Sequence, residues 1–326
     1  AEDGAEEVLR VFLQPAGFDD FLRRPQDHGQ KRQEVVRLGE LGFGTGLNFA
    51  VAAELCLQCR RSMHFVSFEA APIAPNVFRS LALQRASEQS IYGELAKCYP
   101  PLIAGWHRRC LAAGRITLSL YWGDAAAGLA ELETQQKQPF DFWLLDGFAP
   151  AKNPRMWSQP LFSAIAHLSR KDTQVTTFTA AGRVRRGLAA VGFDMRRVDQ
   201  RPHKRESLAG HFVGQGMADW SVPALVNVIG GGIAGASVAR HLAETGMAVK
   251  VFEQCSEVAM GASAIPTAVL HSRLLTDKSV HADLRSHSYL YATSYCDAFA
   301  DQPGTGVHRT GVLQIPSSNT SAARLA

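Results

Sequence analysis

The sequence predicts an α/β protein in which a Rossmann-like, mostly parallel and doubly wound sheet is followed by a shorter βαβ unit. Residues 35–216 alternate short apolar runs with helix-like segments, which is the pattern of a parallel sheet. Glycine-rich turns follow the first of these runs and another run near residue 226, so a nucleotide-binding type of fold begins twice. We therefore expect two domains, residues 1–216 and 226–326, joined by a linker at 217–225.

The expected strands of the first domain are short and apolar: Val35–Glu40, Met63–Phe68, Ile116–Tyr121, Phe140–Asp146 and Gln174–Thr179. The basic stretch from Arg196 to Arg205 is expected to be irregular, and Ser207–Val213 is expected to return as an antiparallel edge strand. The second domain is expected to begin with a strand at Val226–Ile229, a helix at Ala234–Thr245 and a strand at Ala248–Glu253.

The composition is that of a globular protein, with 46% hydrophobic and 20% charged residues. No apolar run approaches the roughly 20 residues of a membrane helix, and the acidic start lacks the basic region of a secretory signal, so we expect a cytoplasmic monomer. The net charge of +4 is compatible with a polyanionic partner.

The cysteines and histidines do not predict a metal site. The single Cys56–Cys59 C-x-x-C motif lacks a second pair of ligands, and His271, His281 and His287 are expected to be surface or satisfied core groups.

The first glycine-rich turn runs from Glu40 to Asn48 and reads ELGFGTGLN. A dinucleotide fingerprint needs glycine at its first, third and sixth positions, which this turn does not provide. The turn fits S-adenosylmethionine, a ligand without a pyrophosphate. Gly42, Gly44 and Gly46 let the backbone approach it, and Glu40 supplies a carboxylate for its amino group. Asn48 is counted as a further cofactor contact.

Acidic residues follow the next two strand-like runs. Glu69 can hold the two ribose hydroxyls, and Asp124 can meet the adenine amino group. An open α/β sheet binds its ligand at the carboxyl ends of its strands. Each acid could instead cap a helix, but the glycine turn ahead of them favours contact with the cofactor.

The fourth strand-like run ends at Asp146, in the sequence LLDGFAPAKNP. An amine has a pKa of about 10 and must lose its proton to attack a methyl group. Asp146 is the candidate catalytic residue, because a carboxylate can orient the amine and receive that proton. Phe148 and Trp157 offer faces on which a base could stack. A turn rich in helix-breaking residues would explain Pro150 and Pro154, but not the acid.

Three segments, GELGFGTGLNF, FVSFEAAP and LLDGFAPAKNPRMW, closely resemble the methyltransferase domain of the bacterial bifunctional tRNA-modifying MnmC family. The resemblance runs from Glu7–Leu13 to Lys204-Arg205-Glu206. It implies transfer of a methyl group from S-adenosylmethionine to the amine of 5-aminomethyl-2-thiouridine at tRNA position 34. It also implies that Asp146 is the catalytic-site acid. The stretch 200–203 reads QRPH where the family usually has glycine–aromatic–glycine.

The second glycine-rich turn is a full G-x-G-x-x-G formed by Gly230, Gly232 and Gly235, with Glu253 at the end of the next strand. This context predicts a dinucleotide on the helix N-terminus, with Glu253 on the adenosine ribose. The GGGIAG form resembles FAD-dependent amine oxidases. In the family this module removes the carboxymethyl group of 5-carboxymethylaminomethyl-2-thiouridine. Here 264–268 lacks the family's glycine and only residues 226–326 follow the linker, so we expect an incomplete FAD module.

Basic residues are expected to contact tRNA phosphates. One is Lys152, in the loop that follows Asp146, which we call the acceptor loop. The others lie in two later groups that include Arg183, Arg185, Lys204 and Arg205. The alternative for each is a solvated helix face.

Three functions stay open on the sequence. The first is a tRNA wobble-uridine methyltransferase with a partial FAD module, and the second is a small-molecule amine methyltransferase fused to an FAD oxidoreductase. The third is a non-catalytic protein that only binds RNA.

Overall fold

The computed structural model of the protein describes residues 4–25, 35–85, 87, 90–135, 138–202, 206–218, 223, 225–245, 247–272, 279–300, 304–308 and 310–312. Its larger sheet contains β1 (Val35–Leu41), β2 (Ser62–Glu69), β3 (Gly105–Leu111), β4 (Ile116–Trp122), β5 (Phe140–Leu145), β6 (Ser169–Thr177), β7 (Phe193–Asp199) and β8 (Glu206–Phe212). A smaller sheet pairs β9 (Leu225–Ile229) with β10 (Ala248–Phe252).

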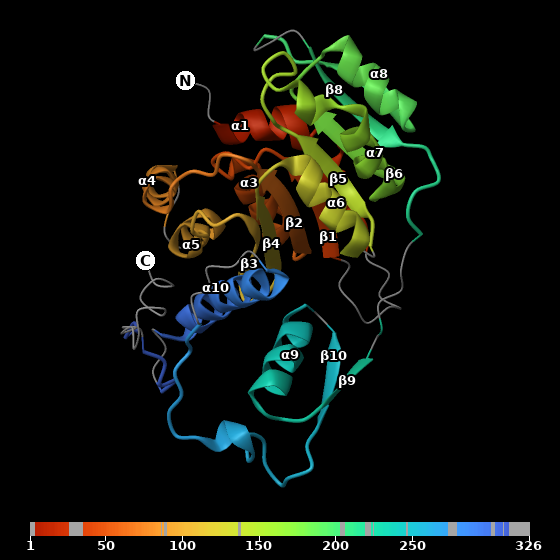
Figure 1. Cartoon of the computed structure of the whole chain (residues 1–326). Coiled ribbons are helices and arrows are strands. Elements are labelled where there is room, and N and C mark those ends of the chain that lie inside the picture. Colours follow the sequence, from red (N-terminus) through yellow and green to blue (C-terminus); the bar gives the residue numbers. More distant parts are fainter. Residues whose placement is uncertain are drawn as a thin grey trace.

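Helices flank both sheets (Figure 1). They are α1 (Gly4–Val8), the π-helix η1 (Leu9–Leu13), α2 (Phe18–Arg23), α3 (Leu47–Gln58), α4 (Pro75–Arg85), α5 (Ile91–Cys98), α6 (Ala125–Gln135), the 3-10 helix η2 (Pro154–Trp157), α7 (Gln159–His167), α8 (Gly182–Ala190), α9 (Ile233–Glu244), the 3-10 helix η3 (Ala262–Ala264) and α10 (Val280–Ala300).

The strands of the larger sheet follow the order β3-β4-β2-β1-β5-β6-β8-β7. The pairs within β4-β2-β1-β5-β6 are parallel, while β3, β8 and β7 join antiparallel. The five apolar runs predicted to be strands are confirmed, and so is the parallel, Rossmann-like sheet. The strand order runs outward in opposite directions from β1 and β5. In such a sheet the usual binding crevice lies beyond the carboxyl ends of these two strands.

Two strands were not predicted. The stretch expected to be irregular begins inside β7, whose second half it contains, and β3 was not predicted at all. The predicted returning strand, β8, is antiparallel as expected, but it lies between β6 and β7 rather than at the edge. Only Phe193 of β7 is buried, so this edge strand carries little of the hydrophobic signal that marks a strand in a sequence.

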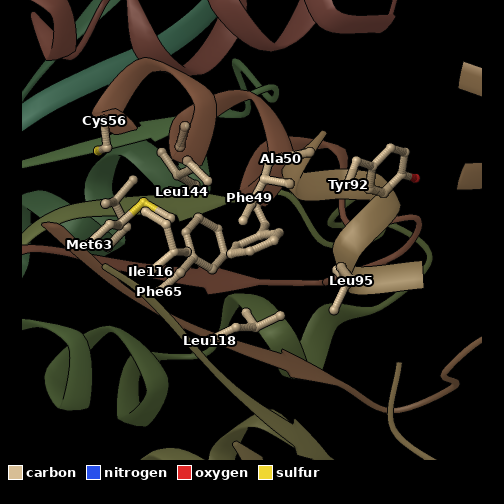
Figure 2. Packing of buried hydrophobic residues seen from close by; sticks show 14 of the residues in the cluster. Phe49, Ala50, Cys56, Met63, Phe65, Tyr92, Leu95, Ile116, Leu118 and Leu144 are labelled. Atoms are coloured by element: carbon tan, nitrogen blue, oxygen red, sulfur yellow. The ribbon is translucent and has the colours of Figure 1, made fainter. Parts of the chain in front are cut away.

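The core beside β1 and β2 is built by one face of α3 (Figure 2). Phe49 and Cys56 are fully buried, and the Phe49 ring meets Phe65 edge-on with centroids 5.5 Å apart. Burial raises the pKa of the Cys56 thiol, which makes it a packing residue rather than a reactive one. No group of side chains within the described ranges could hold a metal ion.

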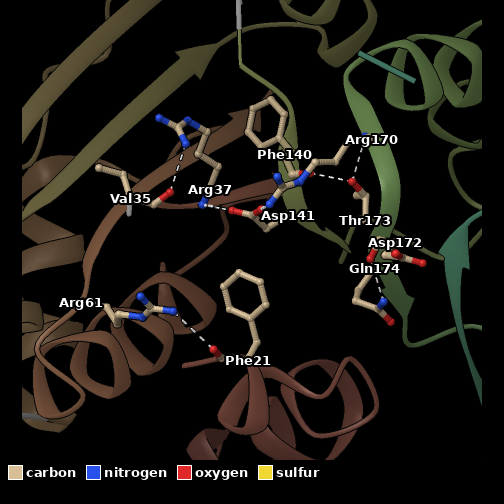
Figure 3. Close-up of polar contacts among 10 residues, drawn as sticks. All are labelled: Phe21, Val35, Arg37, Arg61, Phe140, Asp141, Arg170, Asp172, Thr173 and Gln174. Atoms are coloured by element: carbon tan, nitrogen blue, oxygen red, sulfur yellow. Dashed lines mark hydrogen bonds and ion pairs between the residues drawn. The ribbon is translucent and has the colours of Figure 1, made fainter. Parts of the chain in front are cut away.

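An ion pair ties together the amino ends of the central strands (Figure 3). Asp141 accepts a 2.6 Å hydrogen bond from Arg170 and a 2.8 Å bond from the backbone N–H of Arg37. Burial nevertheless raises the pKa of Asp141 above its usual value. The pair lies at the edge of the sheet opposite the carboxyl ends of the strands, so it contributes to the frame and not to the binding crevice.

The chain leaves the larger sheet at this same amino edge. The N–H of Met217 donates to the carbonyl of Ser169, the first residue of β6, at 2.8 Å. A Cβ at Gly216 would lie 1.8 Å from that carbonyl oxygen, so only glycine fits here. The second part of the chain then places α10 beside β3 (Figure 1). In this part of the chain Ile229, the last residue of β9, and Ile233, the first residue of α9, are strongly exposed, at 90% and 75%.

Candidate active site

The residues predicted to bind the cofactor and the substrate amine lie at the carboxyl edge of the larger sheet. Gly42 directly follows β1, Glu69 ends β2, Asp124 follows β4, and Asp146 follows β5. Because these strands are parallel, their carboxyl ends meet at one edge. The fold therefore brings together four positions that are spread over more than a hundred residues of sequence.

The first glycine turn has the backbone conformation that glycine is needed for. Gly42, Gly44 and Gly46 have φ angles of +91°, +51° and +71°. A Cβ at Gly42 would lie 2.8 Å from the carbonyl oxygen of Asp146, so the turn packs directly against the end of β5. Gly44, in contrast, faces open space with nothing within 4 Å of its Cβ position. The turn is thus fixed on one side and free for the close approach of a ligand on the other.

A buried hydrogen-bond chain holds the carboxylate of Asp146 at this turn. The Nδ2 atom of Asn48, in the first turn of α3, donates to Oδ2 of Asp146 and to Oε1 of Glu40, both at 2.8 Å. The hydroxyl of Ser67 donates to the other Glu40 oxygen at 2.6 Å. Asn48 is 4% exposed and Glu40 is fully buried. The rotamer of Asp146 is therefore constrained by a side chain that is itself constrained.

Glu40 also has hydrogen-bond partners of its own. Its carboxylate oxygens accept from Asn48 and Ser67 and are shielded from solvent, and its contact with the amino group of a ligand stays a prediction. Burial raises the pKa of Glu40 well above its usual value, and the charge of Asp146 adds to the shift.

The other two acids have hydrogen-bond partners of their own. Glu69 accepts from the N–H of Gly44 at 3.0 Å and from the N–H of Ala71 at 2.8 Å. Asp124 caps α6, accepting from the N–H groups of Ala126 and Ala127 on a single oxygen, Oδ1. The helix-cap alternative is thus realised for Asp124. Both side chains remain at the carboxyl edge, and their contact with a cofactor stays a prediction.

The two aromatic residues predicted to stack on a base, both of which follow Asp146, differ in how far they are exposed. Phe148 is 68% exposed, which leaves its ring free to stack on a base. Trp157 is 8% exposed, donates its indole N–H to the carbonyl of Phe148 at 2.9 Å, and packs against Phe178. It therefore offers no open face, because its ring supports the loop from beneath. Met156 further fills the space over Gly147.

The basic residues predicted to contact tRNA are only partly described by the structure. Lys152 is exposed in the acceptor loop, and Arg183 and Arg185 are exposed at the start of α8. Because α8 follows the carboxyl end of β6, these arginines lie toward the same edge as Asp146. Lys204 and Arg205 lie outside the described residues.

The second glycine turn has the geometry of a dinucleotide cradle. Gly230 has a φ of +97° and open space around it, and a Cβ at Gly235 would lie 1.8 Å from the carbonyl oxygen of Gly230. Gly232 is the N-cap of α9. Glu253 accepts a 2.6 Å bond from the N–H of Gly231. These residues fit a bound dinucleotide, because helix N–H groups and an adjacent carboxylate converge on one open turn.

Two residues that shape the first site were not predicted from the sequence. Ser67 holds Glu40, and the hydroxyl of Tyr92 donates to the carbonyl of Thr45 in the glycine turn. Ser67 does lie two residues before Glu69 on β2, where an inward-facing polar residue in an apolar strand is a usable signal. Tyr92 lies 47 residues from Thr45 and has no comparable signal.

Two family models match separate parts of the chain. A family model described as S-adenosyl-L-methionine-dependent methyltransferase matches residues 86–212, and one described as FAD dependent oxidoreductase matches residues 226–326. Within the described residues, no helix is both long and apolar enough to cross a membrane.

Curated relatives match nearly the whole chain. The tRNA 5-methylaminomethyl-2-thiouridine biosynthesis bifunctional protein MnmC of Marinomonas sp. (strain MWYL1) is 36% identical, over 99% of this chain and 49% of its own length. The protein of the same name from Aeromonas hydrophila is 37% identical, over 100% of this chain and 50% of its own length. Among solved structures, MNMC2 from Aquifex aeolicus is 22% identical with a TM-score of 0.47, covering 66% of this chain and 63% of that one. The chain spans about half the length of the curated relatives it matches, and along nearly all of its own length it is similar to the tRNA 5-methylaminomethyl-2-thiouridine biosynthesis bifunctional protein.

Proposed function

We propose that this chain methylates the amine of 5-aminomethyl-2-thiouridine at position 34 of tRNA, giving 5-methylaminomethyl-2-thiouridine, with S-adenosylmethionine as the methyl donor. The catalytic unit is the domain formed by residues 1–216. The observation that carries the proposal is the carboxylate of Asp146, which Asn48 holds directly beside the open glycine turn. The names of the relatives support the choice of substrate.

The cofactor is held by the glycine turn and the acids around it. When bound, S-adenosylmethionine supplies a methyl group on a positively charged sulfur. Gly44 allows the backbone to approach it, and Glu69 and Asp124 face its ribose and adenine. Glu40 acts indirectly, by fixing Asn48.

Asp146 orients the amine and takes up its proton. Bound S-adenosylmethionine would supply the methyl group that the amine nitrogen takes up in exchange for its bond to sulfur, and the proton released by the amine would pass to the carboxylate of Asp146. A carboxylate held in one rotamer near the methyl group reduces the entropy lost in aligning the amine. Proton transfer to a positioned side chain contributes about 10²- to 10⁴-fold to a rate.

The tRNA is bound by one stacking residue and a basic surface. Phe148 offers an exposed ring to the unstacked wobble base, and Lys152, Arg183 and Arg185 contact phosphates. Lys204 and Arg205 are proposed to extend this surface. Because each contact displaces counterions, the affinity for tRNA falls steeply with salt.

The segment 226–326 is proposed to bind FAD through Gly230, Gly232, Gly235 and Glu253. In the longer proteins of the family this region is proposed to remove the carboxymethyl group before methylation. That activity is assigned to the whole protein and not to this chain.

The test is incubation of the chain with labelled methyl donor and tRNA that carries 5-aminomethyl-2-thiouridine, followed by nucleoside analysis. We expect labelled 5-methylaminomethyl-2-thiouridine. Asp146→Ala should lower turnover by about 10²- to 10⁴-fold while the affinity for S-adenosylmethionine is retained. Asp172→Ala, at an exposed acid on β6, is the matched control and should keep full turnover. Cofactor binding without methylated tRNA, or full activity of Asp146→Ala, would overturn the assignment.

A further inference from the structure

A cavity of about 510 Å³ lies where α10 meets the larger sheet, away from both glycine turns. His64 of β2 and Arg108 of β3 line one side, and His287 and Tyr291 of α10 line the other. The ring centroids of His107 and His287 are 5.4 Å apart across this seam. The cavity is therefore shared by the methyltransferase region and the second region of the chain.

Among the described residues, the ionisable side chains that line the cavity are basic, apart from one tyrosine. They are Arg108, Arg109 and three histidines, with no described aspartate or glutamate among them. The guanidinium of Arg109 is engaged by the carbonyl oxygens of Cys98 and Arg108. Arg108 is exposed and pairs with no acid within the described ranges. Of the acids nearby, Asp297 acts on Arg109 and Glu244 pairs with Arg240, but neither lines the cavity.

Burial lowers the pKa of two of the histidines that line the cavity. Burial, with Arg108 and Arg37 nearby, lowers the pKa of His64 to about 3, and its Nε2 lies 2.9 Å from the Ser119 hydroxyl. Burial lowers the pKa of His107 to about 4. The Nδ1 atom of His287 is buried and has no hydrogen-bond partner among the residues described. A buried polar atom without a partner is costly, and an acceptor from a ligand would remove that cost.

We propose that this cavity binds a phosphate group. Arginine matches the geometry of phosphate oxygens, and within the described ranges Arg108 pairs with no acid. The Nδ1 atom of His287 and the hydroxyl of Tyr291 add possible donors from α10. The volume falls within the range of small-molecule sites and leaves room for a nucleoside attached to the phosphate. A bound phosphate would also hold α10 against β3, because it bridges residues of both.

The first test is a titration of the full chain with inorganic phosphate, with no methyl donor present. The histidine ring resonances are followed by NMR and the binding heat by calorimetry. We expect saturable shifts at His107 and His287, and a rise in the pKa of His107, because an anion stabilises the protonated ring. Arg108→Gln should weaken phosphate binding about tenfold, as expected for the loss of one charge-assisted contact.

Two further variants keep this test decisive. Arg79→Gln removes the same charge from an exposed position on α4 and should leave phosphate binding unchanged. His287→Gln removes the α10 donor and should weaken binding even if Arg108→Gln does not fold. Equal binding by the wild type, Arg108→Gln and His287→Gln, or histidine resonances that do not move, would overturn the proposal.

Titration with tRNA then identifies the source of the phosphate. If the site takes an RNA phosphodiester, Arg108→Gln also weakens tRNA binding and lowers its salt slope by about one. If it takes free phosphate or a nucleotide, Arg108→Gln leaves tRNA affinity unchanged. Both results support the phosphate site. Methyl transfer is not part of the readout, so a failure here is separable from a failure of the proposed function.

Discussion

The Nδ2 atom of Asn48 donates a hydrogen bond to Oδ2 of Asp146, 98 residues further along the chain. The same nitrogen also reaches Glu40, whose far oxygen is held by Ser67. Position 48 therefore combines two properties: it begins the helix after the glycine turn, and it orients the acid that faces this turn. Asn48 was predicted to contact the cofactor, and the geometry favours a role in positioning Asp146.

Asn48→Ala is expected to impair turnover more than cofactor binding. Without the amide, Asp146 loses its fixed rotamer, and we expect kcat to fall by about tenfold to a hundredfold with little change in cofactor affinity. Loss of buried hydrogen bonds should also destabilise the fold by about 1–3 kcal/mol. Single-turnover kinetics, calorimetry and urea unfolding measure the three quantities. Asn76→Ala, on an exposed position of α4, serves as the control. A variant with weak cofactor binding and normal kcat would indicate direct cofactor contact instead.

Glu40→Gln is expected to change how stability depends on pH. Because the pKa of Glu40 is raised in the folded chain, its contribution to stability is fully present below the unfolded pKa of about 4.3. It is lost as the pH rises through the folded value, by up to about 1.4 kcal/mol per pH unit. Glutamine cannot ionise, so urea unfolding across this range should show the variant gaining stability relative to the wild type as the pH increases.

The exposed variant Glu7→Gln provides the baseline for that comparison. It should run parallel to the wild type at every pH. A constant difference between Glu40→Gln and the wild type would show that folding does not change the pKa of Glu40.

Alanine at Gly44 and at Gly42 should have different effects. Gly44→Ala meets no atom, so only its left-handed backbone adds a cost of about 1–2 kcal/mol. Its methyl group would enter the proposed cofactor space, and cofactor affinity should fall tenfold or more. Gly42→Ala forces a Cβ against the backbone of Asp146 and should lower the melting temperature further. If Gly44→Ala binds S-adenosylmethionine normally, the turn is not its binding surface.

The two aromatic residues of the acceptor loop should separate into a binding and a structural role. Phe148→Ala removes an exposed ring whose stacking on a base is worth about 1–3 kcal/mol, so KM for tRNA should rise while the melting temperature stays constant. Trp157→Ala removes a buried ring and should cost about 3–5 kcal/mol of stability. Steady-state kinetics and thermal melts distinguish them. An unchanged KM in Phe148→Ala would place the base elsewhere.

The parts of the site that the sequence could predict are those written in contiguous residues. The glycine turn and the acid after β5 follow directly from apolar strands, and parallel strands bring such ends together. The contact between Asn48 and Asp146 could not be predicted, because it depends on the rotamers of residues far apart in the chain. The burial of Trp157 and Glu40 could not be predicted either, because tryptophan and glutamate each occur both at the surface and in buried positions.

The strand β3 was missed for a different physical reason. β3 carries Arg108 and Arg109 in its centre, so its apolar alternation is interrupted. The helix that packs beside β3, α10, is far away in the sequence, and the contact between His287 and His107 is seen only in the folded chain. His287 was expected to be a surface or satisfied group, but its Nδ1 atom is buried without a partner among the described residues.

The contact between Met217 and Ser169 fixes the point at which the second region is attached to the larger sheet. The polypeptide leaves at the edge opposite Asp146, so the proposed methylation site opens away from that point of attachment. We therefore expect a longer protein that carries out two steps on one RNA to reposition the RNA between them.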